Sequence, residues 1–301
     1  MKEPFILIVV SLIGLASPAL ATFHEMQIEQ VIGGVNGDPT AQAIQLRMRF
    51  AGQTQVQNAR LAVYDATGSN AIILIQPPTS VSNGVAGDRI LLVSSNFVNN
   101  TSPATVPDFY LTNLIPASYL AAGKLSWEIS GPTILWSVSW GGTNYTGPNT
   151  GSTINDSDGN FGPSFPGPLP STSTSSLLFT NTAGAPSLSN IVDYIVTPGA
   201  ATFTNNARAG FVVVLPPVIP PVVTTVTHES NDIRVTWTTT AGKTNVVQVT
   251  SGDANGNFTN NFVDLSPPIV VPGSGQVGTN YLDSGGGTNV PARYYRVRLV
   301  P

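Results

Sequence analysis

The chain has 301 residues, only 9% of them charged, and a formal net charge of −4. It contains 29 glycines and 25 prolines but no cysteine, so its stability must come from buried side chains rather than from disulfides. The 12 lysines and arginines form no basic run, which argues against nucleic acid or an anionic membrane as a partner.

The first 21 residues have the pattern of a secretory signal peptide. An apolar run from Phe5 to Leu15 is followed by small residues at Ala19 and Ala21. The run is shorter than the roughly 20 apolar residues that a transmembrane helix needs. We therefore expect a mature chain from Thr22 onward, without a transmembrane segment, that is secreted or held at the cell surface.

Alternation of apolar and polar residues dominates the first two thirds of the chain and predicts β-strands. Residues 43–50 place apolar side chains on one face, namely Ile44, Leu46, Met48 and Phe50, and polar side chains on the other, namely Gln45, Arg47 and Arg49. Residues 134–140 bring together Ile134, Trp136, Val138 and Trp140, which predicts the middle of a core. Further strands are predicted over 59–64, 88–93, 125–129, 176–180, 192–197 and 211–214.

Two irregular segments interrupt this pattern. Residues 116–122 favour a helical turn or two, which Gly123 ends. Residues 141–176 are rich in Gly, Ser, Thr, Asn and Pro, and a segment of this length without regular structure is either a functional loop or a partly disordered one.

A proline-rich spacer divides the mature chain. The prolines at 216–217 and 220–221 remove backbone donors and fix φ, so residues 215–223 favour an extended linker. Beyond it, alternating strands are predicted over 233–239, 245–250 and 292–300, the last with Tyr295, Val297 and Leu299 facing the core. The expected fold is all-β, with a β-sandwich over 22–214 and a second, smaller one over 224–301.

Both parts resemble known modules. Residues 43–46, 59–65, 87–93, 123–127 and 134–141 are similar to the lamin-tail-like immunoglobulin module of secreted bacterial proteins, over about residues 26–142. The strands at Val235-Thr-Trp237 and Tyr295-Arg-Val-Arg298 resemble fibronectin type III modules, over residues 224–301. These resemblances imply immunoglobulin-like sandwiches that serve as accessory, adhesive or spacer modules, and they carry over no catalytic residue.

Catalytic patterns are scarce. The two histidines, His24 and His228, lie far apart, and the sequence contains neither the His-Glu-x-x-His pattern of zinc proteases nor the Gly-x-Ser-x-Gly elbow of hydrolases. A glycosidase needs only two carboxylates in a groove, and the spacing of Asp88 and Glu128 singles out no such pair. We expect no enzyme, with a secreted hydrolase as the less favoured alternative.

A repeated hexapeptide suggests a metal site. Asp156-Ser-Asp-Gly-Asn-Phe161 and Asp253-Ala-Asn-Gly-Asn-Phe258 both carry oxygen side chains at positions one, three and five, which suits calcium. The candidate ligands in the first copy are Asp156, Asp158 and Asn160. The alternative is a glycine-containing turn without a metal, since Asp-Gly and Asn-Gly are common turn dipeptides.

Loop aromatics suggest a binding surface. Tyr145, Phe161 and Phe165 lie in or beside the 141–176 loop, where exposed rings could stack on sugars; the alternative is that they close the end of the sandwich. The hypothesis favoured by the sequence is an exported, non-catalytic protein with a structural or adhesive role at a surface. Its alternative is a carbohydrate- or protein-binding module that uses the 141–176 loop to hold a glycan or an extracellular protein.

Overall fold

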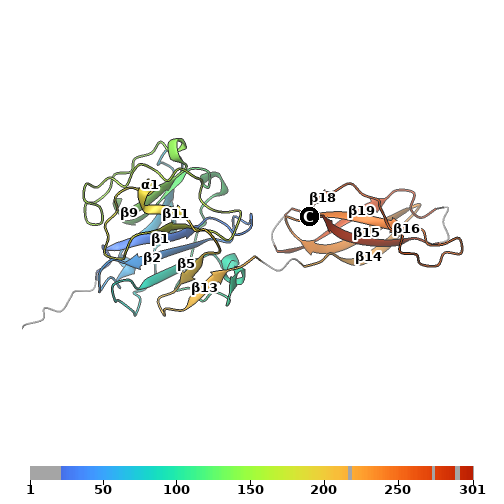
Figure 1. The fold of residues 1–301 in the computed structure, drawn as a ribbon, viewed down its shortest axis with the longest axis horizontal. Helices are drawn as coiled ribbons and strands as arrows, with labels where there is room; N and C mark the ends of the chain where they lie inside the picture. Colours follow the sequence, from blue (N-terminus) through green and yellow to red (C-terminus); the bar gives the residue numbers. More distant parts are fainter. Residues whose placement is uncertain (1–21, 216–218, 273–274, 289–291, 301) are drawn as a thin grey trace, which may run out of the picture. The chain divides into compact units, whose positions relative to one another are not determined.

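The computed structural model describes residues 22–215, 219–272, 275–288 and 292–300. The predicted signal peptide and residues 216–218 of the predicted spacer lie outside the described residues. The chain divides into two compact units, a larger one made of Met1–Gly34 and Pro39–Val213 and a smaller one that contains Val214–Pro301 (Figure 1). Both consist almost entirely of antiparallel sheets, so the predicted all-β class is confirmed.

The larger unit is built on two main sheets that face each other across the core. The first has the strand order β11-β10-β1-β2-β5-β7, and the second has the order β4-β3-β8-β9. The strands of the first sheet are β1 (Met26–Ile32), β2 (Ala43–Met48), β5 (Arg89–Val93), β7 (Phe109–Tyr110), β10 (Leu177–Phe179) and β11 (Tyr194–Val196). Those of the second are β3 (Arg60–Tyr64), β4 (Ile72–Ile75), β8 (Gly123–Ile129) and β9 (Thr133–Trp140).

A third, short sheet and a few helical turns complete this unit. The sheet has the order β12-β13-β6, with strands β6 (Thr101–Ser102), β12 (Thr202–Thr204) and β13 (Gly210–Val213). The turns are η1 (Val56–Asn58), η2 (Ser95–Asn100), η3 (Ala117–Tyr119), η4 (Gly142–Asn144) and α1 (Asn190–Asp193). The helical turn expected over 116–122 is thus η3, whereas the strand expected from 192 begins at Tyr194 because α1 precedes it.

The core between the two main sheets contains the tryptophans of β8 and β9. Trp127, Trp136, Val138 and Trp140 are fully buried there, whereas Ile134, predicted to join the last three, is only partly buried and packs against the core. The Trp136 indole donates to Tyr194 Oη at 2.8 Å, and its ring packs edge-on against Phe179. Tyr194 Oη in turn donates to the carbonyl of Ile28 at 2.6 Å, which links β9, β11 and β1 through one chain of hydrogen bonds.

The polar face that alternation predicts for β2 is buried as well as the apolar one. Gln45, Arg47 and Arg49 are each less than 9% exposed. The segment 181–185 covers this face, because Arg47 donates to the carbonyl of Asn181 and Arg49 to that of Gly184. Phe50, predicted on the same face as Ile44, Leu46 and Met48, follows the end of β2 and is 46% exposed.

The 141–176 loop is packed onto the sandwich. Gly142 donates to the carbonyl of Phe165, and Phe165 donates to that of Ser139 on β9. Asn155 is fully buried and donates to the carbonyls of His24 and Leu135. The loop therefore closes one side of the large unit instead of extending into solvent.

The smaller unit pairs one sheet, β14-β15-β19, with another in which β16 pairs with β17, β18 and β20. The strands are β14 (Val222–Glu229), β15 (Asp232–Thr240), β16 (Thr244–Thr250), β17 (Val263–Asp264), β18 (Ile269–Val270), β19 (Gln276–Asp283) and β20 (Tyr294–Val300). Its core consists of Ile233, Val235, Trp237 and Val247, against which Tyr295 and Val297 pack as expected. The spacer was expected to run to 223, but β14 already begins at Val222, because an edge strand can start directly after proline.

Candidate functional site

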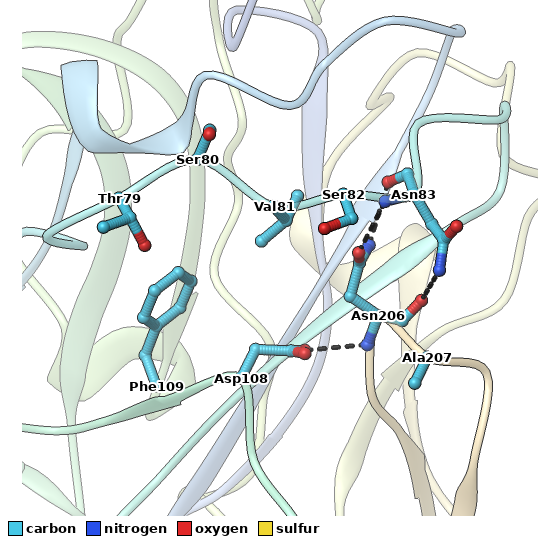
Figure 2. A pocket seen from close by; sticks show the side chains of 9 residues that line it. All are labelled: Thr79, Ser80, Val81, Ser82, Asn83, Asp108, Phe109, Asn206 and Ala207. Atoms are coloured by element: carbon cyan, nitrogen blue, oxygen red, sulfur yellow. Dashed lines mark hydrogen bonds between the residues drawn. The ribbon is translucent and has the colours of Figure 1, made fainter.

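A pocket of about 280 Å³ opens at the β7 edge of the first sheet (Figure 2). Three separate segments line it: residues 79–83 after β4, residues 108–109 at the start of β7, and residues 206–207 in the turn between β12 and β13. We call it the Asp108 pocket, after the one charged side chain in its lining.

Asp108 is held in place by backbone amides. Its Oδ2 accepts from the amides of Leu91 and Asn206, both at 2.8 Å, while its own amide donates to the carbonyl of Leu91. Its Oδ1 takes part in none of the hydrogen bonds found among the described residues. Burial raises the pKa of Asp108 above its ordinary value, and the two amide donors act in the opposite direction. The pocket thus holds a half-buried carboxyl group with one oxygen left for a ligand.

Two asparagines lock the walls of the pocket together. The Asn83 amide donates to Asn206 Oδ1 at 2.8 Å, and Asn83 Nδ2 donates to the carbonyl of Asn206 at 2.7 Å. In return, Asn206 Nδ2 donates to the carbonyls of Asn83 and Arg89. Both polar groups of the Asn206 side chain and the Nδ2 of Asn83 are therefore engaged in shaping the pocket, whereas no hydrogen bond among the described residues engages Asn83 Oδ1.

The remaining lining combines hydroxyl groups with an aromatic ring. Within the described part of the chain, no hydrogen bond engages the hydroxyls of Thr79, Ser80 or Ser82. In Figure 2, the Thr79 and Ser82 hydroxyls lie on the side of Asp108, whereas the Ser80 hydroxyl points away from it. The Phe109 ring stands beside Asp108 and Thr79. Hydroxyls, one carboxyl group and a ring together suit a small polyhydroxylated ligand.

The three loop aromatics predicted to bind a ligand lie elsewhere. Tyr145 is 6% exposed and donates its hydroxyl to the carbonyl of Pro148, and Phe161 is fully buried against Trp136. Phe165 is half-buried, pairs with Trp140 in an isolated bridge and packs on the core. These rings close the side of the sandwich, so the binding surface proposed for them is not formed in this structure.

The predicted metal ligands lie together but are largely engaged in turns. Asp156 Oδ1 accepts from the amides of Asp158 and Asn160, Asp158 Oδ1 accepts from the amide of Asn160, and Asn160 Oδ1 accepts from the amide of Gly162. This is the geometry of the glycine-containing turn that was the alternative interpretation. One atom stands apart, because Asp156 Oδ2 is buried without a hydrogen-bond partner.

The carboxylates considered for hydrolysis are engaged in ion pairs. Glu128 is fully buried and accepts from Arg60, Tyr64 and Ser126. Asp88 pairs with Arg208 at 2.9 Å.

A second, more open pocket is lined by residues 132–134 and 150–153, none of which is charged or aromatic.

Sequence reasoning missed the Asp108 pocket because its parts are far apart in the chain. The available local signals were turn residues, Asn83-Gly84 and Asn205-Asn206, which predict turns but do not show that the two turns contact each other.

The comparisons with known proteins do not help to identify the site: no protein-family model, no curated protein and no solved structure matches this chain.

Proposed function

We propose that this is an exported, non-catalytic β-sandwich protein with an adhesive role at a surface, and that the Asp108 pocket holds one sugar unit of a glycan. The observation that carries the proposal is the pairing of a carboxyl oxygen and free hydroxyls with the Phe109 ring in one pocket. Carboxyl and hydroxyl groups can satisfy a sugar's hydroxyls, while a ring covers its apolar face.

The position and size of the pocket support a binding role. A volume of about 280 Å³ suits one monosaccharide rather than a large cofactor. The asparagine pair joins the 79–83 and 206–207 segments before any ligand arrives, so little ordering is needed on binding. Export is supported by the signal-peptide pattern of the first 21 residues. No helix in the described ranges is long and apolar enough to cross a membrane.

The finer domain assignment is also a proposal. Residues 26–142 of the larger unit are taken as a lamin-tail-like immunoglobulin module and residues 224–301 as a fibronectin type III-like module, on the sequence resemblances given above. Their β-rich, layered sheets are compatible with an immunoglobulin-like sandwich in each case. Such modules act as attachment or spacer elements, which fits a protein whose role is to bind.

Binding to an array of glycans tests the proposal, with the affinity for any glycan retained then measured by calorimetry. Asp108→Asn keeps an oxygen for the two backbone amides but removes the charge, and it should weaken binding at least tenfold, because hydrogen bonds to charged groups are the stronger ones. Ser82→Ala should cost about fivefold, the loss of one neutral hydrogen bond.

Ser80→Ala is the matched control. It removes a hydroxyl from the same loop that points away from Asp108, so the affinity should stay unchanged. An array on which no glycan is retained would reject the proposed function. If the array retains a glycan and both Asp108→Asn and Ser82→Ala bind it as tightly as the wild type does, the binding site lies elsewhere.

A further inference from the structure

One turn occurs three times among the residues that the structure describes, and this allows an internal comparison. In each copy, an aspartate Oδ1 accepts two backbone amides, two and four residues further along. The distances are 2.9 and 3.0 Å at Asp65, 3.0 and 3.2 Å at Asp156, and 2.9 and 2.8 Å at Asp253. The third residue after the aspartate is a glycine with positive φ in every copy: Gly68, Gly159 and Gly256.

The three copies differ at the second carboxylate oxygen. Asp65 Oδ2 accepts from Asn70 Nδ2 at 2.6 Å, and Asp253 Oδ2 accepts from Asn257 Nδ2 at 2.9 Å. Asp156 Oδ2 has no partner, although Asp156 is only 2% exposed. Asn160, which corresponds to Asn257, instead turns its Oδ1 to the amide of Gly162. Asp156 is therefore the one buried aspartate of the three, and it is also the one whose second carboxylate oxygen has no hydrogen-bond partner.

The Asp156 copy also differs by carrying a second acid. Asp158 stands where the other two turns have Thr67 and Asn255. Its side chain contacts that of Asp156, which lowers the pKa of Asp158, whereas burial and this contact raise the pKa of Asp156. Two carboxyl groups in contact need a positive charge between them, supplied by a shared proton or by a cation.

We propose that Asp156 Oδ2 and the carboxylate of Asp158 bind one calcium ion. Carboxylate oxygens are the ligands that this hard cation prefers, and the exposed side of Asp158 leaves room for water to complete its coordination. Asn160, predicted as a third ligand from the sequence, is not part of this set. With two carboxylates, the affinity falls in the millimolar range of extracellular modules.

The ion would stabilise the packing of the 141–176 loop against the rest of the large unit. Asp156 pairs with Ser187 in an isolated bridge, and the Ser187 hydroxyl donates to Asp193 at 2.8 Å. A cation on Asp156 therefore stabilises the contact between this loop and the segment that leads into α1. This site lies outside the Asp108 pocket, and its test is independent of the proposed function.

The test is the melting temperature of the full chain in calcium chloride after treatment with a chelator. For a millimolar dissociation constant, 10 mM calcium should raise Tm by about 3–5 °C. Asp158→Asn should abolish this rise and still fold, because the side chain is exposed and the new amide oxygen can accept from Asn160. Calorimetric titration with calcium should show one site in the wild type and none in the variant.

Asp253→Asn is the matched control, since it changes the same turn where the second oxygen already has a partner. The calcium-dependent rise should be unaltered in this variant. A wild-type Tm that does not respond to calcium would overturn the proposal and leave a shared proton between the two carboxyl groups. An equal rise in the wild type and in Asp158→Asn would overturn it too, by placing the ion elsewhere.

Discussion

At the scale of single residues, several of the few charges of this chain join segments inside the large unit. Glu29 is 3% exposed and accepts from Arg47 at 2.8 Å and from Arg89 at 2.7 Å. Lys124 is 2% exposed, donates to the carbonyl of Pro148 and lies over the Tyr64 ring. Burial lowers the pKa of Lys124, and burial together with Glu128 raises that of Tyr64 to about 12. Such groups are costly to bury and are retained only where partners hold them.

Asp108 should make stability depend on pH. Its pKa is raised in the folded state, so over the range between the ordinary and the raised pKa the folded chain binds more protons than the unfolded chain. The contribution of Asp108 to stability is therefore full below the ordinary carboxyl pKa and is lost as pH rises through the raised value.

Urea unfolding of the wild type and Asp108→Asn between pH 3 and pH 7 would measure this effect. The difference in unfolding free energy between the two proteins should change as pH rises above the ordinary carboxyl pKa of about 3.9, in favour of the variant. A difference that stays constant over the whole range would show that the carboxyl group titrates alike in both states.

At the scale of elements, alternation described the apolar faces of β9 and β2 but not their other faces, which are buried too. On β9, the side chains of Trp136, Val138 and Trp140 all enter the core, as the pattern predicts. On β2, both faces are buried, because the 181–185 segment and β12 pack against the polar one. Alternation records which side chains are apolar, and it cannot record whether a distant segment covers the polar side.

Substitutions on β9 test the assignment of its two faces. Trp136→Ala should lower the free energy of unfolding by about 3–5 kcal/mol, since it leaves a large cavity and removes the partner of Tyr194. Ser137→Ala should change it by less than about 0.5 kcal/mol, although Ser137 is fully buried, because its hydroxyl has no partner to lose. Both values follow from denaturant unfolding, and equal costs at the two positions would contradict the assignment of faces.

At the scale of the whole molecule, each unit has its own core. The large unit is organised around the tryptophans of β8 and β9, and the small one around Trp237 with Val235 and Val247. In the described part of the small unit, Thr238 and Trp237 on β15 pair with Val222 and Val223. The small unit therefore needs the end of the predicted spacer as part of its first strand.

Independent folding of the small unit can be tested by expression. A fragment of residues 219–301 should unfold in one cooperative thermal transition, because its sheets enclose their own core. A fragment of residues 224–301 lacks the first two residues of β14 and should melt at a lower temperature. A fragment 219–301 without a cooperative transition would show that the small unit depends on the rest of the chain.

The sequence by itself determined the class of fold and most of the strands. Period-two alternation at 233–239 reflects burial on one face, so it can be recognised without knowledge of the partner strands. Tertiary structure alone decided the candidate sites. The Asp108 pocket forms because Asn206 meets Asn83 and Asp108 from about 100 residues away, and such contacts leave no periodic trace. The burial of Tyr145 and Phe161 was likewise decided by tertiary structure. The 141–176 loop is rich in small polar residues, and it becomes ordered by inserting its few large rings into a core.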